Sequence, residues 1–389
     1  MYRVPATNSL PVLRFIFYLL LLLLLPDFVI WFNHTRQSEG VWRTVSLVAP
    51  TVLAIVCMIM ILCQVRVMWL MQFTFLLLIC VAVPKLVFVT VAGLGKLVAW
   101  NQPAVQGIFC RVGIVLAIAA ALVQMYGAAF GWRRLQVDKP DIKVAGVPAN
   151  FKGYRVVQVS DLHVGTYGTD TRYVQRLVDS VNLCQPDLIV FTGDLINTDP
   201  EEIIPFVRTL SKLRATDGVL SVLGNHDYCI YSNTKPAAER AMAVKRVVEL
   251  QKRMGWRVLL NENERIARGG DTLYVAGVEN IGKPPFPAVG NLQKAVQGAP
   301  DDACIILLSH DPWHWKHGVV GDKRIALTLS GHTHALQMQV GRFSPAQWII
   351  PEWGGLYRQG NQQLYVSTGV GGSVPYRLGA WPKVELIVL

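Results

Sequence analysis

The sequence predicts an α/β domain over residues 138–389, preceded by a membrane domain with about four transmembrane helices over residues 1–137. The chain is 52% hydrophobic and only 16% charged, which is too apolar for an ordinary soluble protein. Long apolar runs fill the chain up to residue 137, whereas charges and turn residues recur regularly beyond it. In that second part, short strand patterns alternate with helical patterns, as in α/β proteins.

Four apolar stretches are each long enough to cross a bilayer, which takes about 20 residues. They cover about residues 12–32, 45–62, 67–92 and 108–130. Four helices buried inside a soluble protein are the alternative, but such lengths without charge are rare outside lipid. Tryptophans lie near the expected ends of the spans, as is typical of membrane interfaces. These are Trp31, Trp42, Trp69, Trp100 and Trp132.

The first stretch could also be a cleaved signal peptide, because Arg14 precedes a run of leucines at residues 19–25. No small-residue cleavage site follows Asp27, and three more spans come after it, so we interpret it as a retained helix. Asp27 and Lys85 lie near the expected span ends, where charged side chains can reach the interface. We therefore expect an anchor rather than a transport path.

Charge is distributed unevenly along the chain. Residues 1–137 contain ten Lys/Arg and two Asp/Glu, whereas residues 138–389 contain 27 and 24. The basic excess therefore lies beside the membrane segments, where it favours anionic lipids, and no basic stripe suggests nucleic-acid binding. Four spans place both ends of the membrane domain on one side, and the slightly more basic side is expected to be cytoplasmic. Seven scattered cysteines with no paired spacing fit a reducing compartment.

The second part of the chain alternates between the two kinds of periodicity. Helices are expected over residues 171–183, 201–213 and 237–254. Strands are expected over residues 154–160, 187–192, 218–223, 273–278, 304–308, 325–329, 364–367 and 384–388. Polar residues follow several of these strands directly, which is where ligands bind in open α/β sheets.

Five strand ends carry side chains of the kinds that bind metals. Carboxylate and amide oxygens mixed with imidazoles suit Mn, Fe, Co or Zn, and the motifs contain no thiolate of a structural zinc site. Each motif alone is weak, because such residues are common in turns. Together they offer more than four ligands, which predicts two metals with a shared bridge. The motifs are Asp161-Leu162-His163, Gly193-Asp194, Gly224-Asn225-His226-Asp227, Ser309-His310 and Gly331-His332-Thr333-His334.

The series DLH, GDLIN, GNHD, SH and GHTH resembles the calcineurin-like metallophosphoesterase superfamily over residues 154–389. The apolar N-terminal part is similar to the anchors of membrane-bound bacterial members. This resemblance implies a metallophosphoesterase-type sandwich of two mixed β-sheets flanked by helices, with the metals at the edge of the sheets. It also implies a location in the bacterial inner membrane, while the charge balance between the two sides of the spans favours a cytoplasmic catalytic domain.

The resemblance further implies two divalent metal ions (Mn, Fe, Zn or Co) joined by the carboxylate of Asp194. The ligands of the first metal would be Asp161, His163 and His334. The ligands of the second metal would be Asn225, His310 and His332. His226 would contact the substrate and protonate the leaving oxygen, a role that suits an imidazole. A ligand or packing role for His226 is the alternative.

The chain departs from the family pattern at two places. Asn197 stands where many members have an aspartate that orients the acid histidine, and an amide cannot stabilise an imidazolium as a carboxylate does. Ala335 and Leu336 stand where many relatives have two glycines, which permit close approach of a ligand. We therefore expect a narrower or more apolar pocket wall there.

An aromatic segment at residues 344–360 follows the last motif. It is either a lid or substrate-side wall that exposes Trp348, Trp353 and Tyr357, or a loop packed by these aromatic rings.

Four other features lie outside the motifs. His314 and His317 are interpreted as structural or solvent-facing. The glycine-rich residues 369–372 and Arg377 are weaker candidates for contact with a phosphate.

These features predict a membrane-anchored hydrolase that cleaves a phosphodiester or pyrophosphate bond with metal-activated water. The anchor makes membrane lipids partners of the chain and a lipid-linked phosphate a candidate substrate. The alternatives are a phosphomonoesterase, a non-enzymatic scaffold that retains the metal-binding fold, and a transporter or sensor with a regulatory phosphoesterase domain. The last of these is disfavoured because the spans are expected to lack paired buried charges.

Overall fold

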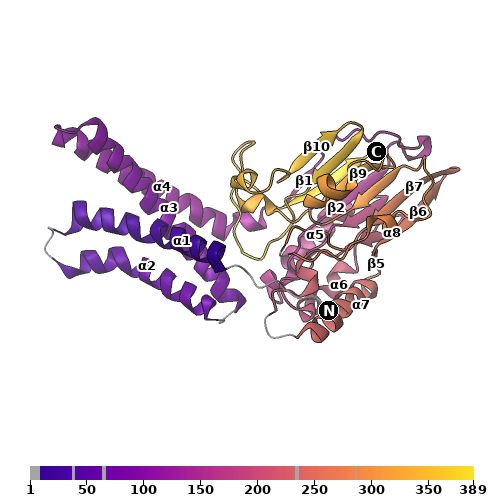
Figure 1. Cartoon of the computed structure of the whole chain (residues 1–389), viewed down its shortest axis with the longest axis horizontal. Coiled ribbons are helices and arrows are strands. Elements are labelled where there is room, and N and C mark those ends of the chain that lie inside the picture. The colour runs from indigo at the N-terminus through magenta and orange to yellow at the C-terminus, as the bar shows by residue number, and fades with distance from the viewer. Residues whose placement is uncertain (1–8, 37–39, 64–66, 233–235, 285) are drawn as a thin grey trace. The chain divides into compact units, whose positions relative to one another are not determined.

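The computed structural model describes residues 9–36, 40–63, 67–232, 236–284 and 286–389. The chain divides into two compact units, Met1–Phe130 and Gly131–Leu389, each described by itself below (Figure 1). We call them the membrane unit and the catalytic unit. The domain boundary expected after residue 137 falls inside β1 (Gln136–Asp138), which belongs to the catalytic unit.

The membrane unit is built from long apolar helices, each long and apolar enough to cross a membrane. This finding confirms the four predicted spans, and the chain is a membrane protein. Helices suit such a unit because all their backbone hydrogen bonds are made within the segment. They are α1 (Ser9–Ile30), extended by a π-helical turn at Trp31–Thr35, α2 (Val41–Leu62), α3 (Met68–Val98) and α4 (Pro103–Ala129).

A buried ion pair links three of these helices. Lys85 Nζ in α3 lies 2.5 Å from Asp27 Oδ1 in α1. The same ammonium donates to Thr51 Oγ1 (2.9 Å) and to the carbonyl oxygen of Leu47 (2.8 Å), both in α2. Asp27 and Thr51 are buried, and Lys85 is half-buried.

Two expectations about the spans are therefore wrong. Lys85 does not lie near a span end, because α3 is longer than predicted and places this residue near its middle. The spans also contain a paired buried charge, since Lys85 is matched with Asp27. A lysine this deep in an apolar helix needs a partner, and a neighbouring helix supplies one.

The catalytic unit is a sandwich of two six-stranded mixed sheets, as predicted (Figure 1). In the first sheet the order is β1, β12 (Lys383–Val388), β2 (Arg155–Val159), β3 (Leu188–Phe191), β4 (Val219–Ser221) and β5 (Arg257–Val258). In the second it is β10 (Gly355–Gln359), β11 (Gln362–Val366), β9 (Ile325–Ser330), β8 (Ile305–Leu308), β7 (Asp271–Gly277) and β6 (Glu262–Arg268). The pairs β2–β12, β6–β7 and β10–β11 are antiparallel, and the other neighbours are parallel.

Helices cover the outer faces of the two sheets. Side chains of α5 (Arg172–Leu183) and α7 (Ala237–Arg253) pack with Val157 and Val159 of β2, while Val156 points into the core between the sheets. This alternation follows from the two-residue period of a strand. On the second sheet, α8 (Leu292–Ala295) and a π-helical turn at Trp315–Val319 form the outer layer.

The secondary structure differs from the prediction in a few places. The helix expected over residues 201–213 is a 3₁₀ segment, Pro200–Phe206, followed by the single turn α6 (Val207–Leu210). Pro205 inside this segment removes a helical hydrogen bond, which explains the irregularity. The short or charged strands β1, β5 and β6 were not predicted, and β10 lies within the segment expected to be a loop.

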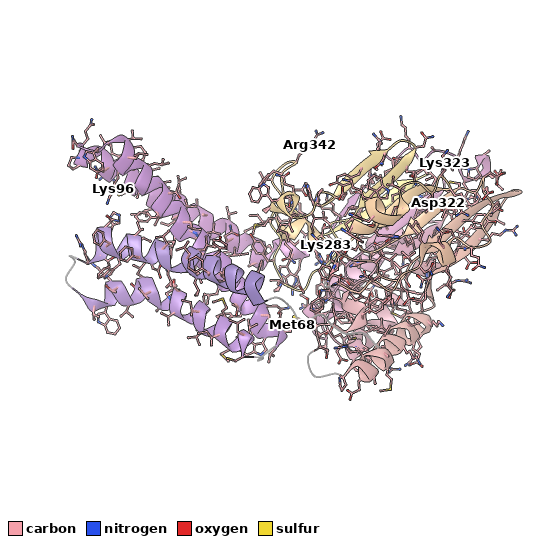
Figure 2. The ribbon with its side chains drawn as sticks, in the orientation of Figure 1. Met68, Lys96, Lys283, Asp322, Lys323 and Arg342 are labelled. Carbon is pink, nitrogen blue, oxygen red and sulfur yellow. The ribbon has the colours of Figure 1, made fainter. Side chains whose placement is uncertain are left out.

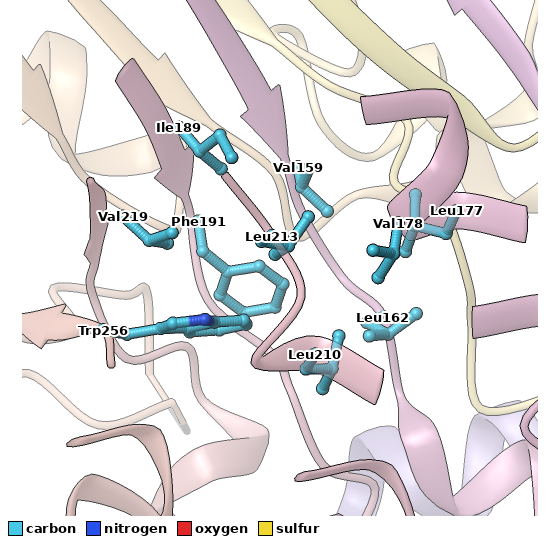
Figure 3. A pocket seen from close by; sticks show the side chains of 10 residues that line it. All are labelled: Val159, Leu162, Leu177, Val178, Ile189, Phe191, Leu210, Leu213, Val219 and Trp256. Atoms are coloured by element: carbon cyan, nitrogen blue, oxygen red, sulfur yellow. The ribbon is translucent and has the colours of Figure 1, made fainter. Parts of the chain in front are cut away.

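The core between the first sheet and its helices contains a small apolar cavity (Figure 3). Its volume is about 10 Å³, and Phe191, Trp256 and Leu177 are among the side chains that line it. Such a space is at most the size of one water molecule and has no polar lining. It is a packing defect rather than a ligand site.

Candidate metal centre

The five predicted motifs come together at one edge of the sandwich. In the first sheet, β2, β3 and β4 run in parallel into the segments that carry Asp161, Asp194 and Asn225. In the second sheet, the parallel strands β8 and β9 run into those that carry His310 and His332. Because parallel strands end at the same edge, side chains far apart in the sequence meet there.

One group of donors consists of Asp161, His163, Asp194 and His334, whose ligand atoms all lie within 4.8 Å of one another. The Nε2 atoms of His163 and His334 are 3.2 Å apart. His334 Nε2 lies 3.5 Å from Asp161 Oδ1, and His163 Nε2 lies 3.6 Å from Asp194 Oδ2. The first three residues are buried, so these atoms face one another rather than bulk water.

A second group consists of Asp194, His310 and His332, again with ligand atoms within 4.8 Å of one another. His310 Nε2 lies 3.2 Å from Asp194 Oδ2. The amide oxygen of Asn225 lies 2.8 Å from His332 Nδ1 and 3.1 Å from His310 Nε2. Asp194 thus belongs to both groups, and its carboxylate lies where they meet.

The far side of two imidazole rings is held by acceptors. His310 Nδ1 donates to the carbonyl oxygen of Thr192 (2.8 Å), which leaves Nε2 to face the cluster. His332 Nε2 lies 3.7 Å from Asp311 Oδ2, so Nδ1 of this ring faces the cluster. Metal-binding histidines in general are oriented by such outer partners. Asp311 was not among the predicted site residues, although an acid directly after His310 was a visible signal.

The backbone at the cluster is strained. Asp161, His163, Asp194, His332 and His334 all have positive φ, between 49° and 73°. Non-glycine residues pay about 1–3 kcal/mol each in such conformations, which collect at functional sites. The rest of the fold must therefore hold these five side chains in place.

The two residues that replace the glycines of the family pattern, Ala335 and Leu336, also have a strained backbone. Ala335 and Leu336 have φ of 53° and 46°, the left-handed region that glycine adopts easily. Ala335 is buried, whereas the side chain of Leu336 is exposed. The two positions therefore keep the backbone that glycines would favour and add apolar side chains to it.

Asp227, the last residue of GNHD, connects two loops of the site. Its carboxylate accepts hydrogen bonds from the backbone amides of Asp194, Leu195 and Gly224, each at 2.9 Å. Burial, together with the charge of Asp194, raises the pKa of Asp227 to about 7, against the lowering effect of these amides. Asp227 was not predicted to have a role, although an acid within the GNHD motif was a visible signal.

The electrostatics of the cluster favour positive charge. Burial alone would lower the pKa of His310, but the carboxylate of Asp194 raises it to about 10. Burial would likewise raise the pKa of Asp194, but the imidazoles of His310 and His226 hold it well below its usual range. A proton on His310 thus offsets the negative charge of the buried carboxylates. A bound metal cation could offset the same charge. Oxygen and imidazole donors at these distances fit divalent transition metals.

His226 lies at the rim of the cluster and is half-buried. Its Nδ1 is 2.6 Å from the backbone carbonyl oxygen of Asn197. Because a carbonyl only accepts, Nδ1 carries the hydrogen and Nε2 remains available for a ligand. The Asn197 side chain instead donates through Nδ2 to Thr166 Oγ1 (2.9 Å). The neutral carbonyl orients the ring as a carboxylate would, without the stabilising negative charge.

Tyr231, which the sequence analysis did not identify, lies beside His226 and Asn225. Its ring centroid is 4.3 Å from that of His226. Its hydroxyl accepts a hydrogen bond from Asn225 Nδ2 (3.0 Å), which turns the amide oxygen toward His310 and His332. An aromatic residue five positions after His226 carried no recognisable signal.

The weaker candidates lie outside the cluster. His314 is buried, with Nδ1 2.9 Å from Ser309 Oγ, and His317 is exposed and stacks on the ring of Trp313 at 4.0 Å. Arg377 is only 1% exposed, because its guanidinium donates to the carbonyl oxygens of Thr368, Ala380 and Gly371. It is buried behind the site, 3.2 Å from His334 Nδ1, so its expected contact with a phosphate is wrong.

The glycine-rich residues 369–372 pack directly behind a candidate ligand. A side chain at Gly369 would come within 2.7 Å of Asp161 Cβ. These glycines therefore allow close packing of the backbone, which accounts for them without a phosphate.

The aromatic segment at residues 344–360 matches each interpretation in part. Trp348 is 75% exposed, as a lid residue would be. Trp353 and Tyr357 are half-buried and line a cleft of about 480 Å³ that also contains Thr368 and Glu385. The sequence could not assign these environments, because they depend on how β10 closes the segment.

Comparison with known proteins identifies the family. A family model described as calcineurin-like phosphoesterase matches residues 154–336. The "Uncharacterized metallophosphoesterase YkuE" of Bacillus subtilis is 30% identical over 71% of this chain and 95% of its own length. The chain is a metallophosphoesterase. This finding confirms the resemblance and makes the chain a metal-dependent phosphoester hydrolase in general terms.

Two animal relatives of this metallophosphoesterase carry the name "Transmembrane protein with metallophosphoesterase domain". The zebrafish (Danio rerio) protein is 29% identical over 76% of this chain and 67% of its own length. The cattle (Bos taurus) protein is 30% identical over 65% of this chain and 56% of its own length. Their names fit a family domain combined with membrane helices.

Proposed function

We propose that this metallophosphoesterase hydrolyses a phosphodiester or pyrophosphate bond with two divalent metal ions. The observation that supports two ions is the position of Asp194, whose carboxylate belongs to both donor groups. A carboxylate has two oxygens and a negative charge, which suits a bridge between two cations. A single ion would leave half of the collected donors without a role.

The donors fall into two sets around this carboxylate. Asp161, His163 and His334 would complete one site, and Asn225, His310 and His332 would complete the other. Mn, Fe, Zn and Co all suit such mixed donors. When bound, the metals would activate a water molecule and offset the charge that develops on the phosphate oxygens.

The protein's own groups would position the substrate and move a proton. His226 would donate from Nε2 to the leaving oxygen, because Nδ1 is held by the Asn197 carbonyl. The neutral amide of Asn225 adds an oxygen donor without a negative charge, so the site stays attractive to a phosphate. Tyr231 keeps that amide in the required orientation.

The membrane unit supports a substrate at the bilayer. Four apolar helices in the same chain keep the site near a lipid surface. A phosphate group carried by a lipid is then always within reach, whereas a soluble substrate gains nothing from the anchor. The side of the spans that leads into the catalytic unit carries slightly more Lys and Arg than the other side, which supports a cytoplasmic catalytic unit at a bacterial inner membrane.

The test is Mn²⁺-stimulated hydrolysis of bis(p-nitrophenyl) phosphate compared with p-nitrophenyl phosphate by the full chain. We expect the diester to be preferred and its cleavage to be lost in Asp194→Asn and reduced in His226→Gln. His317→Gln is the matched control, because His317 is exposed and outside the cluster. A preference for the monoester would favour a phosphomonoesterase. Inactivity of metal-loaded protein on both esters, with Asp194→Asn functional in cells, would favour the scaffold.

A further inference from the structure

One part of the catalytic unit exposes an unusual number of large apolar side chains. In the described part of the catalytic unit there are eleven large apolar residues with high exposure, and five of them lie within residues 336–349. The other six are scattered singly, which is normal for a protein surface. The five are Leu336, Val340, Phe343, Trp348 and Ile349. We call residues 336–349 the apolar segment.

The apolar segment is held by a defined set of hydrogen bonds. Val340 and Phe343 exchange two backbone hydrogen bonds (2.8 and 3.0 Å) around a turn. The hydroxyl of Ser344 donates to the carbonyl oxygen of Ala335 (2.7 Å), and the rings of Phe343 and Trp348 are 5.4 Å apart. Val340, Trp348 and Ile349 are nevertheless 74%, 75% and 71% exposed. Exposed apolar groups on an ordered scaffold usually mark an interaction site.

The composition of the apolar segment matches a membrane interface. It combines Trp, Phe, Ile and Val with one exposed cation, Arg342, and contains no Asp or Glu. Figure 2 shows the Arg342 side chain pointing away from the ribbon at this turn. Tryptophan prefers the headgroup region, aliphatic side chains enter the acyl boundary, and arginine pairs with anionic lipid.

The membrane unit of the same chain keeps the apolar segment near a lipid surface. Its four apolar helices anchor it to a bilayer, so the apolar segment meets lipid at a high effective concentration. Even a weak interfacial preference is then sufficient for contact. A separate protein partner would have to find the apolar segment from solution, without that advantage.

We propose that residues 336–349 form a lipid-contact surface that inserts into the interface of the anchoring bilayer. Leu336 is two residues beyond His334, and Ser344 binds the carbonyl of the intervening Ala335. Contact with lipid therefore occurs next to the candidate metal centre. This holds the site at the level of the lipid headgroups, where it would take a phosphate ester of an amphiphilic lipid. The step from lipid contact to a lipid-borne substrate rests on the proposed function.

The contact can be tested without any activity. The full chain with Val340→Cys carries an environment-sensitive nitrobenzoxadiazole label and is reconstituted into vesicles of phosphatidylcholine and phosphatidylglycerol. Leu183→Cys is the matched control, because Leu183 is a lone apolar residue that is 82% exposed. The unmodified chain, taken through the same labelling, corrects for the native cysteines, of which Cys63 is exposed.

We expect doxyl-labelled lipid to quench the fluorophore at position 340 and to leave the fluorophore at position 183 unchanged. Equal, water-like emission at both positions would overturn the proposal. A shielded label at position 340 that doxyl lipid does not quench would also overturn it, and would indicate contact with protein, such as a second copy of the chain. Weaker quenching in phosphatidylcholine alone would reflect the contribution of Arg342.

A second measurement connects the apolar segment with catalysis. The substrates are phosphatidyl-p-nitrophenol in vesicles and soluble bis(p-nitrophenyl) phosphate, which release the same product from a diester. Combined Val340→Ser, Trp348→Ser and Ile349→Ser should lower the ratio of vesicle to soluble hydrolysis by about tenfold, because apolar burial in the interface is lost. Leu183→Ser should leave the ratio unchanged. An unchanged ratio in the triple variant would mean that lipid contact by the apolar segment does not deliver the substrate. Inactivity of the wild type on both substrates would refute only the proposed function.

Discussion

The two units of this metallophosphoesterase both bury charge, but in opposite ways. In the membrane unit, one ammonium meets one carboxylate, and Lys85 makes two further hydrogen bonds to α2. In the catalytic unit, Asp161, Asp194 and Asp227 are buried close together, and a proton on His310 provides compensating positive charge. The ion pair in the membrane unit is electrically neutral. The buried carboxylates of the catalytic unit need positive charge from protons or metal ions.

The backbone shows the same contrast. Asp27 and Lys85 lie within regular helices. Five of the seven candidate metal ligands have positive φ, where strain has a cost. A buried ion pair inside a helix bundle thus serves packing, whereas strained ligands around an unneutralised cluster indicate a site that performs chemistry. This contrast suggests that the spans are an anchor even though they contain a charge pair.

After Asp194→Asn, which should abolish hydrolysis, substitution of the candidate acid should have the largest effect on catalysis. His226→Gln keeps a polar side chain but cannot deliver a proton, so kcat should fall by about 10²–10⁴-fold. Metal content should stay at the wild-type level, because His226 lies at the rim of the donor groups. The measurement is steady-state hydrolysis of the diester together with metal analysis. Loss of metal in this variant would make His226 a ligand instead.

Removal of one partner of the membrane ion pair should have the largest effect on stability. Lys85→Met leaves the Asp27 carboxylate buried without a cation, which costs about 3–5 kcal/mol. The double variant Asp27→Leu/Lys85→Met should recover most of this loss, and hydrolysis per folded molecule should not change. Thermal unfolding of the full chain in detergent measures both effects.

Lys96→Met is the control for this experiment, because Lys96 is an exposed lysine of the same helix. If Lys85→Met unfolded like the wild type but lost hydrolysis, the ion pair would not serve packing alone. The spans would then take part in function, as in the transporter or sensor alternative.

The outer partner of His332 should contribute a moderate effect. Asp311→Asn keeps the size of the side chain and the acceptor for the Trp313 amide, but removes the charge beside His332 Nε2. Metal affinity should fall by about 10–100-fold, and excess metal should restore activity. Metal titration of hydrolysis measures this shift. Asp322→Asn removes the charge from an ion pair with Arg324 outside the donor groups and should titrate like the wild type; Asp322 is labelled in Figure 2.

The smallest effect concerns a buried carboxyl outside both charge clusters. Glu385 of β12 accepts hydrogen bonds from Ser367 Oγ (2.9 and 3.0 Å), and burial raises its pKa to about 8 from an ordinary value of 4.5. The folded state therefore binds a proton more tightly than the unfolded state, and the free energy of unfolding should decrease as pH rises through this window. Glu385→Gln should lack this decrease.

The corresponding measurement is the difference in Tm between Glu385→Gln and the wild type at about pH 5 and about pH 9. The variant should gain stability relative to the wild type at the higher pH. Glu262→Gln, an exposed change, should show no such trend. A difference in Tm that is constant with pH would mean that Glu385 stays ionised in the folded protein.

The sequence predicted most of the fold and the members of the candidate site, because both depend on local patterns. Apolar length reveals a membrane helix, and a polar residue directly after a strand reveals the edge of a sheet, so Asp161 and His332 could be found. The pairing of Lys85 with Asp27 could not be found, since the two residues are 58 positions apart and meet through helix packing. The same limit applies to the amides that surround Asp227.

The hydrogen-bond partner of His226 also could not be predicted from the sequence. Asn197 was recognised as a departure from the family pattern, but the group that binds the imidazole is its backbone carbonyl. Residue identity says little about where a carbonyl points. Exposure of residues 336–349 is likewise a property of the folded surface, because the aromatic residues there could equally have packed inward, as Trp353 partly does.

The most direct test of the central claim is the metal content of the purified full chain, measured by mass spectrometry in the wild type and Asp194→Asn. We expect about two divalent ions per wild-type chain and a clear loss in Asp194→Asn, because that carboxylate belongs to both donor groups. His226→Gln should retain both ions. A wild-type chain with a single ion, or an Asp194→Asn chain with the wild-type metal content, would contradict a carboxylate bridge shared by two metals.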